Sequence, residues 1–213
     1  LLLADSPGGP ALLAALRPWF AAYTDWLLTS DLGLDEAKQA NNHGSWYDVQ
    51  VALFGLFAGQ TEPAQQVLGQ FREKRLLTQL QPDGGQPREL ARTISLSYSL
   101  MNLEALTLAA RLAEHLRIDL WRGQEPPGPG IRDAVDYLLP YVPDDRHWPH
   151  QQIKPAGPIA GARGLRLAAL RYDAYAYEQA WVTRAGSEAP RHRLNLLHAT
   201  PVPSKPTPRF HCH

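Results

Sequence analysis

Apolar residues recur at steps of three and four along most of the chain, and no segment alternates apolar and polar residues as a β-strand does. A step of three or four residues matches the 3.6 residues per turn of an α-helix, whereas a strand needs a period of two. The pattern therefore predicts an all-α fold. It is clearest between residues 10 and 30, where it comprises Leu12, Leu13, Leu16, Trp19, Phe20, Tyr23, Trp26 and Leu27.

Loops rich in proline and glycine, such as QPDGGQP at 81–87 and GQEPPGPG at 123–130, separate the helical segments. Helices joined by such loops are expected to stack as helical hairpins, either as an open bundle or as part of an α/α toroid. Ser45 is the expected N-cap of the second helix, and Gly59 its end. The further helices are predicted at 45–58, 62–80, 88–116, 131–139 and 162–183, with an irregular stretch over 143–162.

The length and charge of the chain limit what it can be. Its 213 residues suit one domain, and from about residue 185 onward we expect an extended tail. Lys plus Arg and Asp plus Glu number 21 each, so no overall charge attracts nucleic acid or a membrane surface. No run of roughly 20 apolar residues could span a bilayer. Cys212 is the single cysteine, which excludes an internal disulfide, and nothing in the sequence indicates an oligomeric state.

The first candidate site lies in the segment NNHGSWYDVQ at residues 41–50. It combines two amides, Asn41 and Asn42, with His43 and the aromatic residues Trp46 and Tyr47. Asparagine is also favoured at helix ends, and a lone histidine is more often a structural residue than a catalyst. The segment therefore predicts either a polar binding site or a helix cap.

The second candidate site is a polar stripe on the predicted helix 88–116. At about 100° per residue, its members fall within an arc of roughly 120°. The preceding Gly84-Gly85 loop would let the backbone and Gln86 approach a ligand closely. A polar stripe usually faces solvent, so this alternative stays open. The stripe consists of Arg88, Arg92, Ser95, Tyr98 and Asn102.

The third candidate site is the segment HWPHQQ at residues 147–152. The indole ring of Trp148 could stack on the apolar face of a sugar, while His150 and Gln151 bind its hydroxyls. The alternative is a tryptophan that fills the core. His147 and His150 lack a third ligand at a recognised spacing, and His211, Cys212 and His213 sit on the tail, so we expect no metal site.

These residue types suit one reaction, the abstraction of a proton α to the carboxylate of a uronic acid sugar. The resulting carbanion lies beside an existing negative charge, which must first be neutralised. Amide and imidazole N–H groups can do this by hydrogen bonding to the carboxylate. A tyrosine beside an arginine can then remove the proton and protonate the leaving glycosidic oxygen.

Five segments of the chain read NNHGSWYDVQ, DGGQPRELARTISLSYSLMNLEAL, DLW, YLLPYV and WPHQQI. They resemble motifs of the alginate lyase superfamily of polysaccharide lyases, in particular its NNHG-type members. The resemblance extends over residues 19–182 and implies an α/α toroid that acts on a uronate polymer, alginate or glucuronan, by β-elimination without a cofactor. Only 40 residues precede the Asn-Asn-His segment, so we expect residues 1–184 to form a catalytic domain without the family's early helices and 185–213 to form the tail.

The resemblance also implies roles for individual residues. Asn42 and His43 would engage the uronate carboxylate, with His43 a candidate to share the base role. Arg92 would steady the anionic site, and Tyr98 would be the acid and base. The expected substrate-binding residues are Asn41, Trp46, Tyr47, Gln86, Arg88, Trp148, His150 and Gln151. The resemblance also implies an anionic polysaccharide as the binding partner and a periplasmic or secreted location.

Two other functions remain open from the sequence. An inverting glycoside hydrolase on an α/α barrel would need two carboxylates about 6.5–9.5 Å apart, and Asp48, Asp83 and Glu89 are the nearby candidates. The other is a helical carbohydrate-binding scaffold that has kept the fold and lost catalytic turnover.

Overall fold

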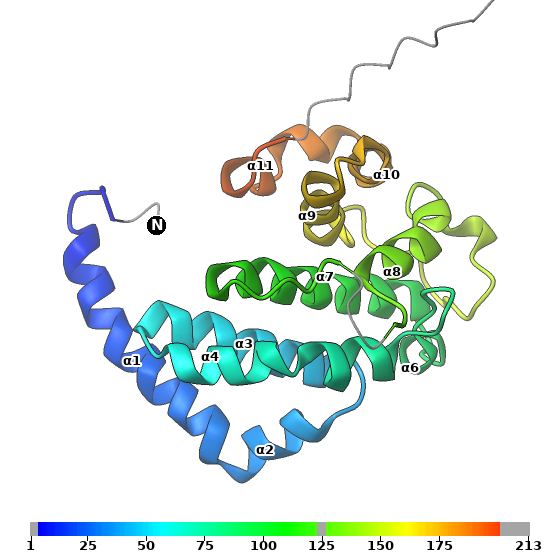
Figure 1. The fold of residues 1–213 in the computed structure, drawn as a ribbon. Coiled ribbons are helices and arrows are strands. Elements are labelled where there is room, and N and C mark those ends of the chain that lie inside the picture. The colour runs from blue at the N-terminus through cyan, green and yellow to red at the C-terminus, as the bar shows by residue number, and fades with distance from the viewer. Residues whose placement is uncertain (1–3, 123–126, 201–213) are drawn as a thin grey trace, which may run out of the picture.

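The computed structural model describes residues 4–122 and 127–200, and helices make up most of these ranges (Figure 1). No β-strand forms within them, and Ile94 and Gln152 make an isolated bridge. The helices are α1 Gly9–Thr29, α2 Asp31–Lys38, α3 Asn42–Ala58, α4 Thr61–Gly69, α5 Leu77–Gln79, α6 Pro87–Leu90, α7 Ser95–Ala113, α8 Ile131–Leu138, α9 Ala162–Tyr172, α10 Tyr175–Ala185 and α11 Leu194–Leu197. A π-helical segment, η1, spans Arg72–Leu76, and 3-10 turns span Glu114–Leu116, Leu139–Tyr141, Asp145–His147 and Gly186–Arg191.

The helices pack as successive layers. Helix α3 packs against α1, α2, α4 and α7, and α7 in turn packs against α8 and α9, which pairs with α10 (Figure 1). The turn between α3 and α4 is short because Gly59 adopts a φ of 88°, a left-handed conformation that glycine adopts without strain. The predicted all-α class is confirmed, whereas the closure of these layers into a toroid stays a prediction.

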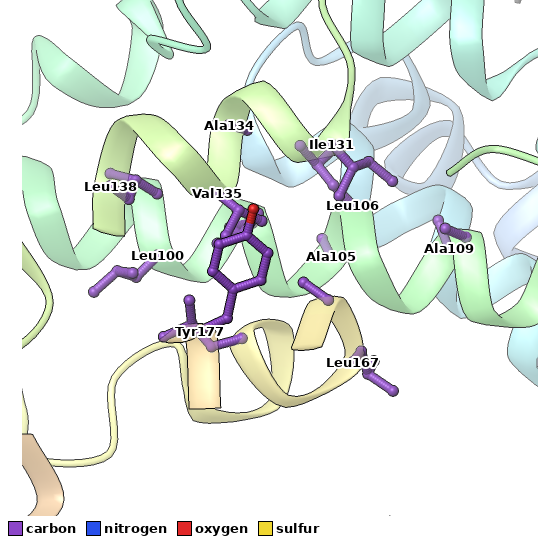
Figure 2. Packing of buried hydrophobic residues seen from close by; sticks show 14 of the residues in the cluster. Leu100, Ala105, Leu106, Ala109, Ile131, Ala134, Val135, Leu138, Leu167 and Tyr177 are labelled. Atoms are coloured by element: carbon purple, nitrogen blue, oxygen red, sulfur yellow. The ribbon is translucent and has the colours of Figure 1, made fainter. Parts of the chain in front are cut away.

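The core lies around α7, which packs against α3, α4, α6, α8 and α9. Leu100 and Leu106 of α7 meet Ile131 and Leu138 of α8, and Tyr177 of α10 closes the cluster (Figure 2). All four aliphatic side chains are fully buried, and burial of a side chain of this size contributes about 1.5–3 kcal/mol. No helix of the described ranges has both the length and the apolar character needed to cross a membrane.

The predicted helix over 88–116 is interrupted. Helix α6 ends at Leu90, and α7 begins only at Ser95. Between them the chain pairs with residues 151–153, since the Ser95 N–H donates to the Gln151 carbonyl (3.1 Å) and the Ile153 N–H donates to the Thr93 carbonyl (3.0 Å). These tertiary bonds replace helical ones where β-branched Thr93 and Ile94 favour helix least.

The predicted helix over 162–183 is also two helices, because Asp173 takes a left-handed φ of 50° between α9 and α10. The described part of the expected tail is not extended. Residues 186–200 form a 3-10 turn and α11, with Ala189 and Leu194 buried against the preceding helices. The rest of the predicted tail, from residue 201, lies outside the described residues.

A buried ion pair connects the segment after α10 to helices α9 and α10. Arg166 of α9 donates two hydrogen bonds to the Glu178 carboxylate of α10, at 2.7 and 2.6 Å, and both side chains are almost fully buried. Arg166 also donates to the Asn195 side chain and to the His198 carbonyl (both 3.0 Å). The indole N–H of Trp181 donates to the same carboxylate at 2.8 Å. The Arg166–Glu178 pair thus holds α9, α10 and the segment after them together.

Replacement of Glu178 by alanine should therefore destabilise the fold by about 3–5 kcal/mol, because it leaves the buried Arg166 charge uncompensated. Chemical denaturation followed by circular dichroism measures this change. Exposed Glu188 provides the matched control, and Glu188→Ala should alter the free energy of unfolding by less than about 0.5 kcal/mol. Equal stability of the two variants would contradict the assigned role.

Candidate active site

A groove of about 620 Å³ opens between α1, α2, α3 and α7. His43 at the start of α3 and Tyr98 in the first turn of α7 both line it, as the sequence predicts. Aromatic and apolar side chains supply most of the remaining wall. The lining residues are Tyr23, Trp26, Leu27, Leu32, Gly33, Glu36, Asn42, His43, Trp46, Tyr47, Gln50, Tyr98 and Met101.

The Asn-Asn-His segment builds the first turn of α3. Asn41 is the N-cap, because its side-chain oxygen accepts the His43 N–H at 3.2 Å, and the predicted cap Ser45 lies buried inside the helix. Asn42 is held twice by buried Glu89 of α6, which accepts its backbone N–H (2.7 Å) and its side-chain amide N–H (2.8 Å). The Asn42 amide therefore has a fixed orientation at the wall of the groove.

His43 is paired with a carboxylate that the sequence did not single out. Its Nδ1 lies 3.1 and 3.3 Å from the two carboxylate oxygens of Glu36, near the end of α2. About half of each side chain is exposed, 49% for His43 and 50% for Glu36. Both residues line the groove, so the pair lies within the candidate site.

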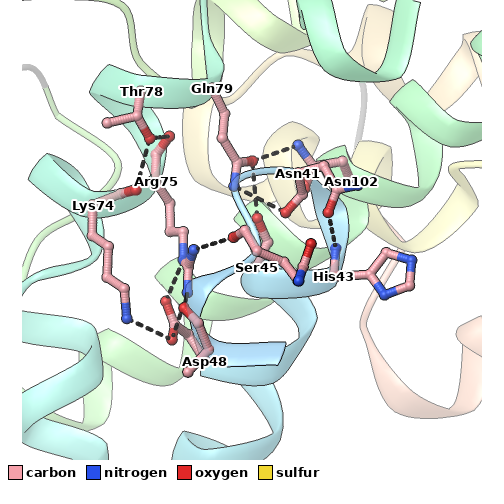
Figure 3. Close-up of polar contacts among 11 residues, drawn as sticks. Asn41, His43, Ser45, Asp48, Lys74, Arg75, Thr78, Gln79 and Asn102 are labelled. Atoms are coloured by element: carbon pink, nitrogen blue, oxygen red, sulfur yellow. Dashed lines mark hydrogen bonds and ion pairs between the residues drawn. The ribbon is translucent and has the colours of Figure 1, made fainter. Parts of the chain in front are cut away.

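A buried arginine fixes the ends of α2 and α3 relative to each other. Arg75 of η1 donates to the Asp48 carboxylate of α3 at 2.7 and 3.2 Å (Figure 3). It also donates to the Gln39 carbonyl (2.7 Å) and the Ala37 carbonyl (3.0 Å), which end α2. A Cβ on Gly44 would lie 2.1 Å from the Gln39 carbonyl oxygen and 2.3 Å from the Arg75 guanidinium, so the glycine of the NNHG motif leaves room for both partners of this contact.

A network of amides and hydroxyls connects the same region to α7. Gln79 donates to the Asn41 carbonyl (3.1 Å) and accepts from Ser45 (3.0 Å) and from Asn102 (2.9 Å) (Figure 3). Asn102 also donates to the Gln86 side chain at 3.0 Å. Gln86 in turn donates to the Ser99 carbonyl at 3.2 Å, so both ends of its buried amide are used within the protein, and Gln86 is absent from the groove wall.

The guanidinium of Arg92 lies over the ring of Tyr98. The Arg92 guanidinium carbon lies 4.0 Å from the centroid of the Tyr98 ring, a cation–π contact. Tyr47 lines the same groove, but its hydroxyl is already used, because it donates to the Leu27 carbonyl at 3.0 Å. Burial also raises the pKa of the Tyr47 phenol. Of these two phenols, Tyr98 is therefore the one suited to proton transfer.

The predicted polar stripe does not exist as one helical face, because the interruption at 91–94 separates its members. Ser95 is buried and donates to the Gln151 carbonyl at 2.6 Å, and Asn102 is buried in the amide network. Arg88 is exposed on α6 and is absent from the groove wall. Arg92 and Tyr98 remain together through their ring contact.

The third predicted cluster does not line the groove either. Trp148 is only 8% exposed and donates its indole N–H to Ser95 at 2.7 Å, which places it in the core, the alternative that the sequence left open. His150 lies 2.9 Å from the Tyr137 hydroxyl, and Gln151 contacts Ser95 through its backbone. Aromatic surface in the groove comes instead from Tyr23 and Trp26 of α1 and from Trp46 of α3.

Sequence reasoning missed Glu36, Glu89 and Arg75. Glu36 lies on α2, a helix of eight residues that was not predicted at all. Glu89 was considered only as a hydrolase carboxylate, and Arg75 lies within a helical segment without any local signal. The polar character of 41–48 was a sign that buried partners had to exist, since buried polar groups require them.

No group of three His, Cys, Asp or Glu side chains that could hold a metal occurs within residues 4–122 and 127–200. His147 and His150 therefore form no such group, whereas His211, Cys212 and His213 lie outside the described residues.

Comparisons with known proteins agree with this fold. The chain is similar to an alginate lyase from Bacteroides ovatus, with 31% identity and a TM-score of 0.76, over 86% of this chain and 49% of that one. It is similar in fold to alginate lyase A1-III, in a variant complexed with tetrasaccharide and in the apo form, each with 22% identity and a TM-score of 0.51 over 65% of this chain and 40% of that one.

The chain thus spans about half the length of the Bacteroides ovatus lyase. No curated protein matches it. The family model for alginate lyases matches residues 2–148, which include the whole wall of the groove and the segments that hold it in place. The chain therefore belongs to the alginate lyase family.

Proposed function

We propose that the protein is a polysaccharide lyase that cleaves a uronate polymer, alginate or glucuronan, by β-elimination. The observation that carries the proposal is that His43 and Tyr98, from different helices, line one groove together with Asn42. A sugar ring bound in this groove can meet an amide, an imidazole and a phenol at once. These are the groups that the elimination requires.

In the proposed reaction the carboxylate of the uronate binds beside Asn42 and His43. The Asn42 side chain gives one N–H to Glu89 and keeps a second N–H, which can donate to the carboxylate oxygen. Because Glu89 fixes the amide beforehand, little reorganisation is needed when negative charge builds on the acid oxygens. This lowers the energy of the carbanion formed next.

The proton on the carbon next to the carboxylate is then taken by the phenolate oxygen of Tyr98, with His43 as a candidate to share this step. The electron pair forms a double bond to the neighbouring ring carbon, and the glycosidic oxygen leaves from that carbon and takes a proton from Tyr98. Arg92 on the ring face stabilises negative charge that develops on the phenolic oxygen. The product is an unsaturated uronate at the new chain end.

The aromatic side of the groove suits the apolar faces of sugar rings. Tyr23 and Trp26 are nearly parallel, with ring centroids 5.8 Å apart, and Trp26 remains 44% exposed. Tyr23 also packs on Phe54, which keeps the pair in place. These rings take the stacking role that was predicted for Trp148. We expect a protein acting on such a polymer to be periplasmic or secreted.

The charge pattern of the groove disfavours an inverting hydrolase. Among its described lining residues, Glu36 is the one carboxylate, whereas that mechanism needs two. Asp48 and Glu89 are buried and committed to Arg75 and Asn42. Lyase activity of the wild-type protein would exclude a binding scaffold without turnover, and the next experiment measures that activity.

Replacement of Tyr98 by phenylalanine should lower turnover by a factor of roughly 10² or more, because it removes the proton-transfer group and keeps the ring. The assay is ultraviolet absorbance of the unsaturated product with alginate blocks and glucuronan as substrates. Tyr175, which lies outside the groove on α10, provides the control, and Tyr175→Phe should leave turnover unchanged. Full activity of Tyr98→Phe would exclude the assignment.

Replacement of Trp26 by alanine should raise KM about two- to tenfold with little change in kcat, since a lost ring contact costs about 0.5–1.5 kcal/mol of binding. Steady-state kinetics on oligosaccharides measures the effect. Trp19 is a matched control, because it lies on the same helix, is 59% exposed and is absent from the groove wall. An equal rise in KM for Trp19→Ala would argue against a specific role for Trp26.

A further inference from the structure

The contact between Glu36 and His43 joins two helices inside the groove. Both carboxylate oxygens lie within 3.3 Å of the imidazole Nδ1. A carboxylate accepts hydrogen bonds, so the contact requires a proton on Nδ1. Nε2 is then the ring nitrogen left for the groove.

The backbone around this contact is fixed by buried groups. Arg75 binds the carbonyls of Ala37 and Gln39, directly after Glu36, and also binds Asp48, which follows His43 on α3. At the other end of α2, the Ser30 side chain caps the helix by accepting the Gly33 N–H at 3.1 Å. The two partners are thus placed by a rigid frame, although their own side chains are half exposed.

Stability does not explain the contact. A pair of side chains that are both about half exposed contributes about 0–1 kcal/mol to folding. In a groove for an anionic substrate, the Glu36 carboxylate alone would also repel the ligand. The remaining titratable groups of the wall are the phenols of Tyr23, Tyr47 and Tyr98, and among the described lining residues there is no lysine or arginine. His43 is therefore the only group there that can offset the charge of Glu36.

We propose that Glu36 is a positioning residue for His43, which holds the Nδ1–H form of the ring and directs Nε2 toward the substrate. The inference rests on the proposed lyase function for its effect on rate, but the state of the ring can be measured without any substrate. In this arrangement Nε2 presents its lone pair or, in the imidazolium, its N–H at a fixed place. Either role of His43 in the reaction depends on that placement.

Two substitutions separate the hydrogen bond from the charge. Glu36→Gln keeps an oxygen that can accept the Nδ1–H, whereas Glu36→Ala removes the acceptor. Glu36→Ala should lower kcat roughly tenfold to a hundredfold without raising KM, because a misplaced catalytic group affects the rate and the groove loses a negative charge. Glu36→Gln should keep most of the wild-type kcat.

Asp35→Ala is the matched control, since it removes an exposed carboxylate from the same turn of α2 and leaves kcat unchanged. Circular dichroism and thermal unfolding establish that all three variants fold. Nitrogen-15 NMR of the His43 ring, assigned with a His43→Gln variant, gives a readout independent of activity. We expect the Nδ1–H form in the wild type and in Glu36→Gln, and a mixture or the Nε2–H form in Glu36→Ala.

An unchanged His43 ring signal in Glu36→Ala would overturn the proposal, and so would a changed signal accompanied by an unchanged kcat. A changed signal in a protein that lacks lyase activity even as wild type would support the positioning of the ring and reject the proposed function. The two failures are thereby distinguished.

Discussion

The candidate site depends on one buried guanidinium. Arg75 connects the end of α2 to the first turns of α3, and it does so from η1, a π-helical segment in which the chain carries an extra residue per turn. A charge in this position is tolerated because Asp48 and two carbonyls satisfy it. The NNHG glycine fits the same junction, since a Cβ at residue 44 would lie 2.1 Å from the Gln39 carbonyl oxygen and 2.3 Å from the Arg75 guanidinium. The motif thus encodes the packing beneath the groove as well as the groups within it.

The fold could be predicted from the sequence as far as local periodicity decides it. The helix α1 and the end of α3 at Gly59 were predicted correctly, because an amphipathic repeat and a glycine stop are local signals. The breaks after Leu90 and at Asp173 were missed. The first arises from pairing with residues 151–153, which lie far away in the chain, and such tertiary bonds leave no local pattern. Helix α2 was too short to show a repeat.

Within the candidate site, the meeting of His43 and Tyr98 at one groove agrees with the prediction, whereas the supporting residues could not be foreseen. Trp148 and Gln86 have the residue types of a sugar site, yet the fold uses one as core and the other as a link between helices. Composition could not separate these uses, because burial decides between them. Conversely, Glu36 showed no signal in the sequence and Trp26 was one member of an apolar helical repeat, and only the packing of α1 and α2 against α3 brings both to the groove.

The amide network behind the groove has a consequence for the working range of the protein. The links among Asn41, Gln79, Gln86 and Asn102 consist of carboxamides and backbone carbonyls, which neither gain nor lose protons in water at ordinary acidity. This part of the scaffold therefore keeps the same hydrogen-bonding pattern in mildly acidic and in alkaline surroundings. The amide links thus give the scaffold a part whose bonding does not depend on acidity, beside the ionisable contacts of Asp48 with Arg75 and of Glu89 with Asn42.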